Sequence, residues 1–366
     1  MTVIPVIVWA VLGLAGFLLA ARMFRRPADA AGAEATRVSI VIPARNEAHN
    51  LPRLLHSIAA QDLKPQEVIV VDDASTDGTA GIAEAHGAKV ISPPALPEGW
   101  RGKTWALHHG TQAAAGDLLM FMDADTWFEP GGLERVLGLY SKLEGGKHSL
   151  RGLEGRRPSL RGALSVVPYH EVVRLYEDLS MFFNLCMAAG TVPDGLSGQF
   201  LLVGREDLER AGGHESVRGK VLENFHLADH FRAAGIAVRG VTGRGMVALR
   251  MYPEGFASLV EGWTKGFAAG AGKTPPHVMA LVVAWMTSLM LPPLLAWLAG
   301  DWRIGLATWL AGVAQLAWIA RRLGSFGWTG MIFHQVPLCF FFGMFAWASM
   351  RPGRKVTWKG REIHAD

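Results

Sequence analysis

The sequence predicts a mixed α/β domain with a mostly parallel sheet and helices on both sheet faces, and it places transmembrane helices before and after this domain. Between residues 36 and 250, short apolar runs alternate with segments of helical spacing, which is the pattern of a parallel sheet. Near both ends of the chain lie long stretches with almost no charge. Of the 366 residues, 50% are hydrophobic and 19% are charged, against roughly 25% charged in soluble domains.

The composition also excludes several classes of protein. The 36 Lys and Arg against 32 Asp and Glu leave a net charge of +4. A chain this hydrophobic is neither disordered nor collagen-like. Cys186 and Cys339 are too few for a disulfide scaffold and are expected to be free thiols, which suits a reducing compartment. The sequence has no basic stripe interleaved with aromatic residues, so no nucleic-acid partner is expected.

Residues 1–24 are expected to form a transmembrane anchor. The first 21 residues carry no charge, and about 20 apolar residues cross a bilayer. Arg22, Arg25 and Arg26 follow this stretch, whereas a signal peptide has its positive charge before the apolar run. The alanine-rich segment 28–35 could imitate a cleavage site, but the order of charges favours an uncleaved anchor. The arginines place the next domain in the cytoplasm.

Residues 36–250 are expected to form the α/β domain. The expected strands cover residues 37–43, 68–71, 88–91 and 117–122, and the expected helices cover 46–60, 77–86 and 103–115. Ligands bind beyond the carboxyl ends of the strands in such sheets. Polar residues follow three of the strands there: Arg45, Glu47, Asp72, Asp73, Asp123 and Asp125. Segment 142–162 adds six basic residues, either as a solvated loop or as a contact with anionic lipid headgroups.

Two apolar regions and a basic tail complete the chain. Residues 252–272 have the spacing of an interfacial amphipathic helix, although glycines weaken this pattern. Residues 278–350 contain only four Asp, Glu, Lys or Arg residues and are expected to form about three spans, near 278–299, 304–320 and 331–350. These features predict a multi-pass protein of the cell membrane with a cytoplasmic catalytic domain.

The tail at 351–366 introduces a conflict. Four spans that start from an outside N-terminus put the tail outside, whereas its five Lys and Arg residues favour the inside. Either one apolar stretch is re-entrant or the positive-inside rule fails here.

Two common phosphate-binding motifs are absent. A dinucleotide fold has G-x-G-x-x-G after its first strand, where this chain has Pro43-Ala-Arg-Asn-Glu47. Gly102-Lys103-Thr104 is similar to the end of a P-loop, but no glycine stands five residues before Gly102. The sequence therefore argues against a dehydrogenase and an ordinary P-loop ATPase.

Asp123-Ala124-Asp125 is a candidate metal site. Two carboxylates at a strand end can together bind a hard cation, and Mg²⁺ typically takes one or two carboxylates plus substrate phosphates. Asp72-Asp73 is a second acidic strand end. Asp77 and Thr79, which follow it, are expected to serve mainly in helix capping and turn formation.

Together these motifs resemble the family 2 glycosyltransferases. The resemblance covers residues 38–47 (VSIVIPARNE), 70–79 (VVDDASTDGT), Gly102-Lys103 and the Asp123/Asp125 pair, and it continues at 198–200 and 212–214. It implies a GT-A fold, inverting transfer from a nucleotide sugar, and Mg²⁺ or Mn²⁺ as the cofactor. It also implies that Asp73 contacts the base of the nucleotide. The implied donor-binding residues are Pro43, Arg45, Glu47, Asp73, Lys103 and Asp123, and the implied metal ligands are Asp123 and Asp125.

A narrower resemblance, to the carotenoid-acid glycosyltransferases of the diaponeurosporenoate type, covers most of the chain. It rests on residues 165–170 (SVVPYH), 183–185 (FNL), 250–256 (RMYPEGF), 261–265 (EGWTK), 270–272 (GAG) and 358–361 (WKGR). It implies a membrane protein with a lipid acceptor, most simply a carotenoid carboxylic acid. The segment 252–272 would carry this acceptor from the bilayer to the site, or would only anchor the domain. The acceptor-side candidates are Gln199, Phe200, Trp263 and Lys265.

One position departs from the family pattern. Family 2 enzymes often use the Asp of a Glu-Asp pair as the general base, but this chain has Glu223-Asn224. Asn cannot be a general base, so Glu223 is the nearest candidate and Asp229 a weaker one. Our hypothesis is that the acceptor is a carboxylic acid. It is already ionised near neutral pH, needs no strong base and yields a glycosyl ester.

Several alternatives stay open at this point. The acceptor could be another lipid, such as a hopanoid, a ceramide or a polyprenyl phosphate, and the chain could be a catalytically silent membrane scaffold. A processive polysaccharide synthase would need more spans and a Gln-x-x-Arg-Trp motif, which the sequence lacks. A transporter would need a buried charge relay. Uridine diphosphate is the usual carrier in the family, which favours UDP-glucose, but no residue distinguishes one hexose from another.

Overall fold

The structure is a computed structural model, and it describes residues 3–24, 37–145, 162–220, 222–270, 274–350, 355–358 and 361–364. The cleavage-like segment 28–35, most of the basic segment 142–162 and half of the tail 351–366 lie outside the described residues.

The α/β domain is built on a seven-stranded sheet with the strand order β3-β2-β1-β4-β8-β6-β9. The first four of these strands are mutually parallel, β6 and β9 are parallel, and β8 is antiparallel to both of its neighbours. The strands are β1 (Val38–Ala44), β2 (Glu67–Asp72), β3 (Lys89–Ile91), β4 (Leu118–Met122), β6 (Ala163–Val167), β8 (Phe200–Gly204) and β9 (Val238–Thr242). The predicted mostly parallel sheet is confirmed, including its four expected strands.

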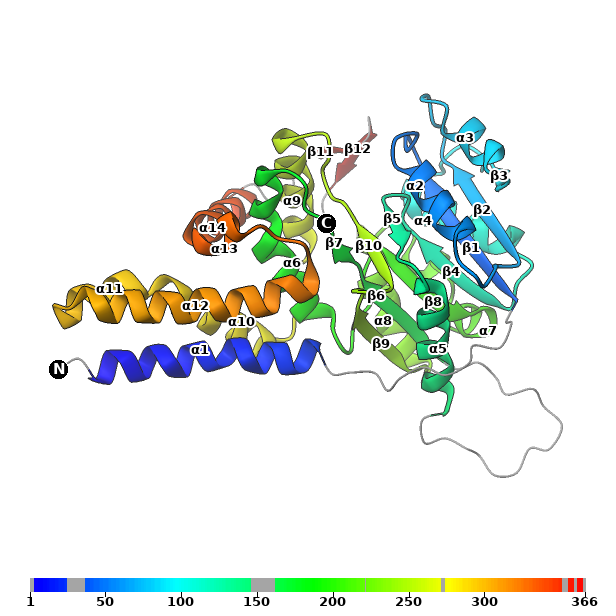
Figure 1. The fold of residues 1–366 in the computed structure, drawn as a ribbon. Helices are drawn as coiled ribbons and strands as arrows, with labels where there is room; N and C mark the ends of the chain where they lie inside the picture. The colour runs from blue at the N-terminus through cyan, green and yellow to red at the C-terminus, as the bar shows by residue number, and fades with distance from the viewer. Residues whose placement is uncertain are drawn as a thin grey trace.

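Helices cover both faces of this sheet, as predicted (Figure 1). Successive side chains of a strand point to opposite faces. Ile40 and Ile42 therefore share a core with one set of helices, and Val41 shares a core with the other. The first set is α2 (Leu51–Ala59), α3 (Thr79–Ala85) and α5 (Gly132–Gly145), and the second is α4 (Gly102–Ala113), α7 (Arg205–Arg210) and α8 (Glu223–Ala233), with the 3₁₀ turn η2 (His214–Val217) beside α8.

A second, three-stranded sheet joins the middle of the domain to its end. It consists of β5 (Thr126–Phe128), β10 (Val247–Leu249) and β7 (Tyr169–His170). β5 and β10 are antiparallel, with Thr126 opposite Leu249. Because Asp125 precedes β5 and Arg250 follows β10, the acidic turn after β4 and the chain that enters the last third of the protein lie at the same end of this ladder.

In the part of the chain that the structure describes, two helices are long and apolar enough to cross a membrane, namely α1 (Val3–Met23) and α12 (Trp302–Leu323). A third crossing is possible if α10 (Pro276–Met290) and α11 (Pro292–Ala299) act as one span, because these helices are bent by 53° at a short break. Figure 1 shows all four side by side, extending away from the sheet domain. Two prolines, at 292 and 293, account for the bend.

The expected span near residues 331–350 is not a single helix. The region is divided into α13 (Trp328–Ile332) and α14 (Gln335–Ser349). His334 lies at the break and is fully buried, with its Nδ1 3.0 Å from the carbonyl oxygen of Met331 and its Nε2 3.1 Å from that of Leu289. The 15 residues of α14 rise only about 22 Å, less than the ~30 Å core of a bilayer.

The amphipathic segment forms α9 (Phe256–Gly270), close to the expected bounds. α9 packs with the 3₁₀ turn η1 (Leu175–Ser180), α6 (Met181–Thr191) and α14. Their buried side chains form one apolar core with the ends of α1, α10 and α12. The sheet domain and the apolar helices are therefore joined by a shared core. A small antiparallel hairpin, β11 (Lys355–Trp358) and β12 (Arg361–His364), follows.

Candidate active site

Two predicted site carboxylates, those of Asp123 and Glu223, meet at the ammonium group of Lys103. This Nζ lies 2.8 Å from Oδ1 of Asp123 and 3.0 Å from Oε1 of Glu223, and it donates a 2.7 Å hydrogen bond to the carbonyl oxygen of Gly198. Lys103 lies in the first turn of α4, Asp123 directly follows β4, and Glu223 is the first residue of α8. Three elements that are distant in the sequence thus converge on one cation.

The two carboxylates hold Lys103 in its charged form. Burial disfavours the ammonium group, but the charges of Asp123 and Glu223 outweigh it and raise the pKa of Lys103 above its usual value. The side chains of Lys103 and Asp123 are 32% and 28% exposed, whereas that of Glu223 is 5% exposed. Lys103 and Asp123 can therefore meet a substrate, while Glu223 stabilises the lysine from behind.

Asp123 and Asp125 lie on the tight turn between β4 and β5. The backbone N–H and the hydroxyl of Thr126 donate hydrogen bonds of 3.1 and 2.7 Å to the carbonyl oxygen of Asp123, which fixes this turn. Within the described part of the chain, no group of three or more His, Cys, Asp or Glu could hold a metal by itself. A pair of hard carboxylates that leaves the other positions to phosphate and water fits Mg²⁺ or Mn²⁺.

The predicted donor pocket lies where the loops after β1 and β2 bind each other. The guanidinium of Arg45 donates a 2.6 Å hydrogen bond to the carbonyl oxygen of Asp73, whose own N–H donates to Ala44. The N–H of Glu47 donates to the hydroxyl of Thr79 at 2.9 Å. Asp73 is 8% exposed. Three of the residues implied for donor binding, Arg45, Glu47 and Asp73, therefore belong to one hydrogen-bonded double loop.

Backbone strain marks this double loop. Asn46 and Ala74 have φ values of 53° and 55°, in the left-handed region that non-glycine residues rarely adopt. The side chain of Asn46 accepts a 2.8 Å hydrogen bond from the N–H of Thr76 across the two loops. Pro43 lies near the end of β1, in register with Val71 of β2. The strain and Pro43 lie at the edge where parallel sheets bind ligands.

Asp77 and Thr79 have the local role predicted for them. The carboxylate of Asp77 accepts hydrogen bonds from the N–H of Thr79 at 3.2 Å and from that of Ala48 at 3.0 Å. These contacts fix the start of α3 and join it to the loop after β1.

The two candidates for a general base lie in different environments. Glu223 is part of the Lys103 cluster, whereas Asp229 lies on the outer surface of α8, where its side chain is 62% exposed and pairs with Arg232 at 2.9 Å. Six residues of helix separate the two, about 9 Å along the axis. The position of Asp229 does not support a catalytic role. Asn224 is 5% exposed and donates a 2.6 Å hydrogen bond to the carbonyl oxygen of Ser197.

The acceptor candidates are divided between the core and the site. Phe200 is fully buried in the main sheet, where its ring meets Phe128 edge to face, so its side chain does not line the site. The carbonyl oxygen of Gln199 accepts a 3.0 Å hydrogen bond from the N–H of Asp123, which places this residue beside the acidic turn. Lys265 lies on α9, but its side chain is outside the described residues.

Trp263 links α9 to the sheet domain. Its indole N–H donates a 2.9 Å hydrogen bond to the hydroxyl of Ser180. Its ring stacks on Phe183, with centroids 4.3 Å apart, and meets Tyr252 at 5.9 Å. Phe183 in turn contacts Phe341 of α14 at 5.0 Å. An aromatic row thus runs from the apolar helix α14 to Tyr252.

Two groups at the site were not assigned by sequence reasoning. The carbonyl oxygen of Gly198 accepts a hydrogen bond from Lys103. Burial and the charge of Asp125 raise the pKa of the Tyr252 phenol. Both residues belong to motifs that resemble the family, at 198–200 and 250–256. Neither motif indicates by itself that Gly198 or Tyr252 lies near the acidic turn. The contacts depend on tertiary structure.

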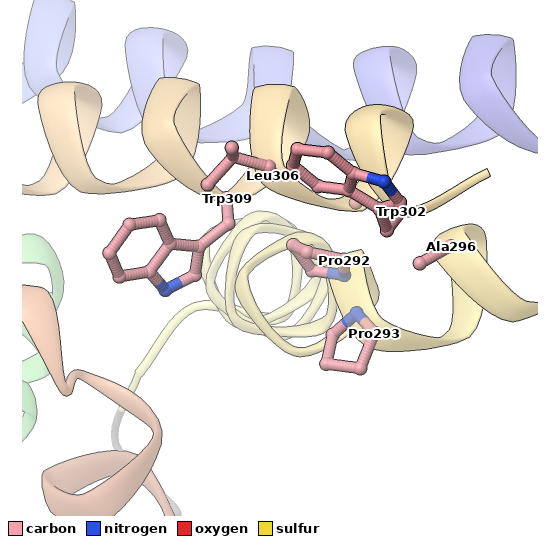
Figure 2. Close-up of a pocket in the computed structure, with 7 residues that line it drawn as sticks. Pro292, Pro293, Ala296, Trp302, Leu306 and Trp309 are labelled. Atoms are coloured by element: carbon pink, nitrogen blue, oxygen red, sulfur yellow. The ribbon is translucent and has the colours of Figure 1, made fainter.

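An apolar pocket of about 240 Å³ lies apart from these residues, between α11 and α12 (Figure 2). Its lining residues are Pro292, Pro293, Ala296, Trp302, Gly305, Leu306 and Trp309. Because no ionisable side chain lines it, it offers no group for sugar transfer.

Comparisons with known proteins identify the family of this chain. A family model described as glycosyl transferase family 2 matches residues 39–145. The 4,4'-diaponeurosporenoate glycosyltransferases of Staphylococcus aureus strains MRSA252 and USA300 are each 35% identical to this chain over 344 residues, which cover 89% of this chain and 88% of the relative.

A similar solved structure is the mannosyltransferase of Pyrobaculum calidifontis in complex with GDP-mannose and Mn²⁺. It has a TM-score of 0.54 and 21% identity, and the match covers 94% of this chain and 99% of that one. This similarity shows the GT-A fold, and the relatives show the family. The protein is therefore a glycosyltransferase that belongs to family 2, in the group of the 4,4'-diaponeurosporenoate glycosyltransferases.

Proposed function

We propose that the protein transfers a hexose from a nucleotide sugar, UDP-glucose in the first instance, to the carboxylate of a carotenoid acid at the membrane, with inversion at the sugar carbon. One observation carries the proposal. The acidic turn leads into Thr126, which pairs with Leu249 three residues before Tyr252, and Tyr252 packs with Trp263 and Phe183 in a buried aromatic row that reaches the apolar helix α14. The donor site thus lies beside the core that joins the sheet domain to the apolar helices.

The donor side is supported by the charges of the site. A divalent cation bound by Asp123 and Asp125 would neutralise the departing nucleoside diphosphate, as Lewis acids do. Lys103 supplies a fixed positive charge for the same phosphates, and it is held in place by Glu223 and the carbonyl oxygen of Gly198. The double loop with Arg45, Glu47 and Asp73 would bind the nucleoside.

The acceptor class is supported by the surroundings of Asn224. An amide cannot remove a proton, and this amide donates its hydrogen bond to Ser197. Glu223 is paired with Lys103 at 3.0 Å, which makes it an anchor for the lysine rather than a free base. A carboxylate acceptor needs no base, because model carboxyl groups titrate near 4. The relatives are named for a carotenoid acid, diaponeurosporenoate.

We infer the membrane arrangement from the helix ends that contact the sheet domain. Arg22, at the end of α1, pairs with Asp194 at 3.2 Å, and Ser325, just after α12, donates a 2.9 Å hydrogen bond to the carbonyl oxygen of His170. α1 and α12 thus both run toward the domain. We infer that α10–α11 crosses in the opposite direction and that α14 stays on the side of the domain.

Three crossings resolve the conflict over the tail. From an outside N-terminus, they place the domain and the basic tail on the same, cytoplasmic side. Arg321 and Arg322, in the last turn of α12, then also lie inside. The short α14 takes the place of the expected fourth span.

A transfer assay in membranes tests the function. The reaction would contain UDP-glucose, Mg²⁺ or Mn²⁺, and a carotenoid carboxylic acid or the matched carotenoid alcohol, with products resolved by mass. We expect an alkali-labile hexosyl ester from the acid alone, with none from Asp125→Ala. Transfer to neither acceptor, with UDP still released by the wild type alone, would point to another lipid such as a hopanoid. A wild type that releases no UDP from any donor would favour a silent scaffold.

A further inference from the structure

We propose that the phenol of Tyr252 binds the head group of the acceptor beside the acidic turn and orients it for attack on the sugar. This inference rests on the proposed function and adds a residue to its acceptor site. Tyr252 lies three residues after β10 and is half-buried.

The backbone holds Tyr252 in a strained conformation. Its φ of 59° lies in the left-handed region, which is costly for a bulky residue that precedes a proline. Two contacts maintain it. The hydroxyl of Tyr176 donates a 2.7 Å hydrogen bond to the carbonyl oxygen of Tyr252, and Arg250 is fixed by Glu177 at 2.7 Å. Strain of this kind persists where the surrounding structure over-determines it, and it gathers at ligand sites.

The ring is placed against α9 by a close approach at Gly262. A Cβ built on Gly262 would lie 2.2 Å from Cε1 and 2.4 Å from the hydroxyl oxygen of Tyr252. The phenol therefore rests on the backbone of α9, directly beside Trp263, whose ring is 5.9 Å away. Only glycine at 262 allows this position, which puts the hydroxyl at the end of the aromatic row.

The hydroxyl is positioned as a hydrogen-bond donor for a substrate. It makes no hydrogen bond to any residue that the structure describes, and its oxygen is not fully buried, so it can reach a substrate. A phenol titrates near ~10 and burial raises the pKa of Tyr252 further, so the group stays protonated at neutral pH. A neutral O–H donor beside acidic groups can bind an acceptor oxygen without adding negative charge.

The register of the small sheet brings this donor to the metal-binding turn. Thr126 pairs with Leu249, so the chain that carries Tyr252 leaves the ladder beside Asp125. An acceptor head group that approaches from the side of the apolar helices would meet the phenol first and the acidic turn next. Its carboxylate would accept a hydrogen bond from Tyr252 while one oxygen faces the sugar carbon.

The test is Tyr252→Phe in the full-length protein in membranes, with the carotenoid acid and UDP-glucose varied in turn. The substitution keeps the ring and removes only the hydroxyl. Since hydrogen bonds to charged groups are among the stronger ones, we expect KM for the acid to rise by roughly 10-fold to 100-fold, while KM for UDP-glucose stays within about twofold. Tyr169→Phe, in the small sheet, is the matched control and should change neither constant.

A second variant tests the geometry with the phenol intact. Gly262→Ala would push the ring off α9 and should also raise KM for the acid. Unchanged KM and kcat for the acid in Tyr252→Phe would overturn the inference alone, and an equal rise in both KM values would mean that Tyr252 only supports the fold. A wild type that makes no ester from the acid would overturn the proposed function, and this inference with it.

Discussion

The side-chain amide of Asn224 donates a 2.6 Å hydrogen bond to the carbonyl oxygen of Ser197, the neighbour of the Gly198 carbonyl that binds Lys103. Asn224 thus joins the start of α8 to the loop before β8. A carboxylate at this position could not donate the bond. Asn224, which stands where the family often has its general base, therefore has a positioning role.

Replacing Asn224 by Asp tests this role. Two acceptor oxygens would face each other in a buried place, so we expect the free energy of unfolding to fall by about 1–3 kcal/mol. Asp229→Asn, on the exposed side of the same helix, should change it by no more than about 0.5 kcal/mol. Thermal unfolding in detergent measures both. Our account would be wrong if Asn224→Asp gained transfer to an alcohol while neither protein used the carotenoid acid.

Lys103→Met should affect both stability and donor binding. The substitution leaves Asp123 and the buried Glu223 facing each other without their cation. We expect a loss of about 1–3 kcal/mol of stability, because Lys103 is partly exposed, and a rise of at least about tenfold in KM for UDP-glucose. Arg232→Met, which removes the surface pair with Asp229 and a hydrogen bond to the carbonyl oxygen of Asp194, should leave KM unchanged. Steady-state kinetics on the two variants would decide.

Asp125→Asn should weaken the dependence on a divalent cation. The variant keeps the size of the side chain and removes one anionic ligand. We expect the metal concentration for half-maximal transfer to rise by at least about tenfold, and kcat at saturating metal to fall by about 100-fold or more. Mg²⁺ and Mn²⁺ titrations after chelator treatment measure this. Wild-type transfer that persists in excess chelator would contradict the metal site.

Stability should fall as the pH drops below about 6.5. Burial lowers the pKa of His170 to about 4, whereas an unfolded histidine titrates near ~6.5. Between these values the unfolded chain binds a proton that the folded protein does not, so acid favours unfolding, by up to ~3 kcal/mol for this residue. Unfolding measured from pH 7.5 to 4.5 should show this slope, and His170→Gln should reduce it. A slope unaffected by the substitution would assign the effect to another group.

The topology makes a separate prediction. With three crossings, an epitope tag at the N-terminus should be cleaved by protease added to intact spheroplasts, whereas a tag at the C-terminus should be protected until the membrane is opened. A C-terminal tag cleaved in intact spheroplasts would show that α14 crosses the bilayer after all.

The alternation of apolar runs and helical spacings was enough to predict the parallel sheet and the four strands β1 to β4, and the uncharged stretch was enough to predict the leading apolar helix. These features depend on local periodicity and on the transfer of side chains from water to an apolar medium. The acidic turn was also predictable, since carboxylates that follow parallel strands meet at one edge. The motifs at 38–47 and 70–79 then identified the family.

Contacts between distant segments were decided only by the tertiary structure. The contact of Lys103 with Glu223 and that of His334 with Leu289 join elements separated by long stretches of chain, and the placement of Tyr252 over Gly262 joins the loop after β10 to α9. No local period reports such pairs, because they form when burial of apolar surface brings whole helices together. The sequence therefore determined which elements form and what chemistry they carry, and packing decided which side chains face one another.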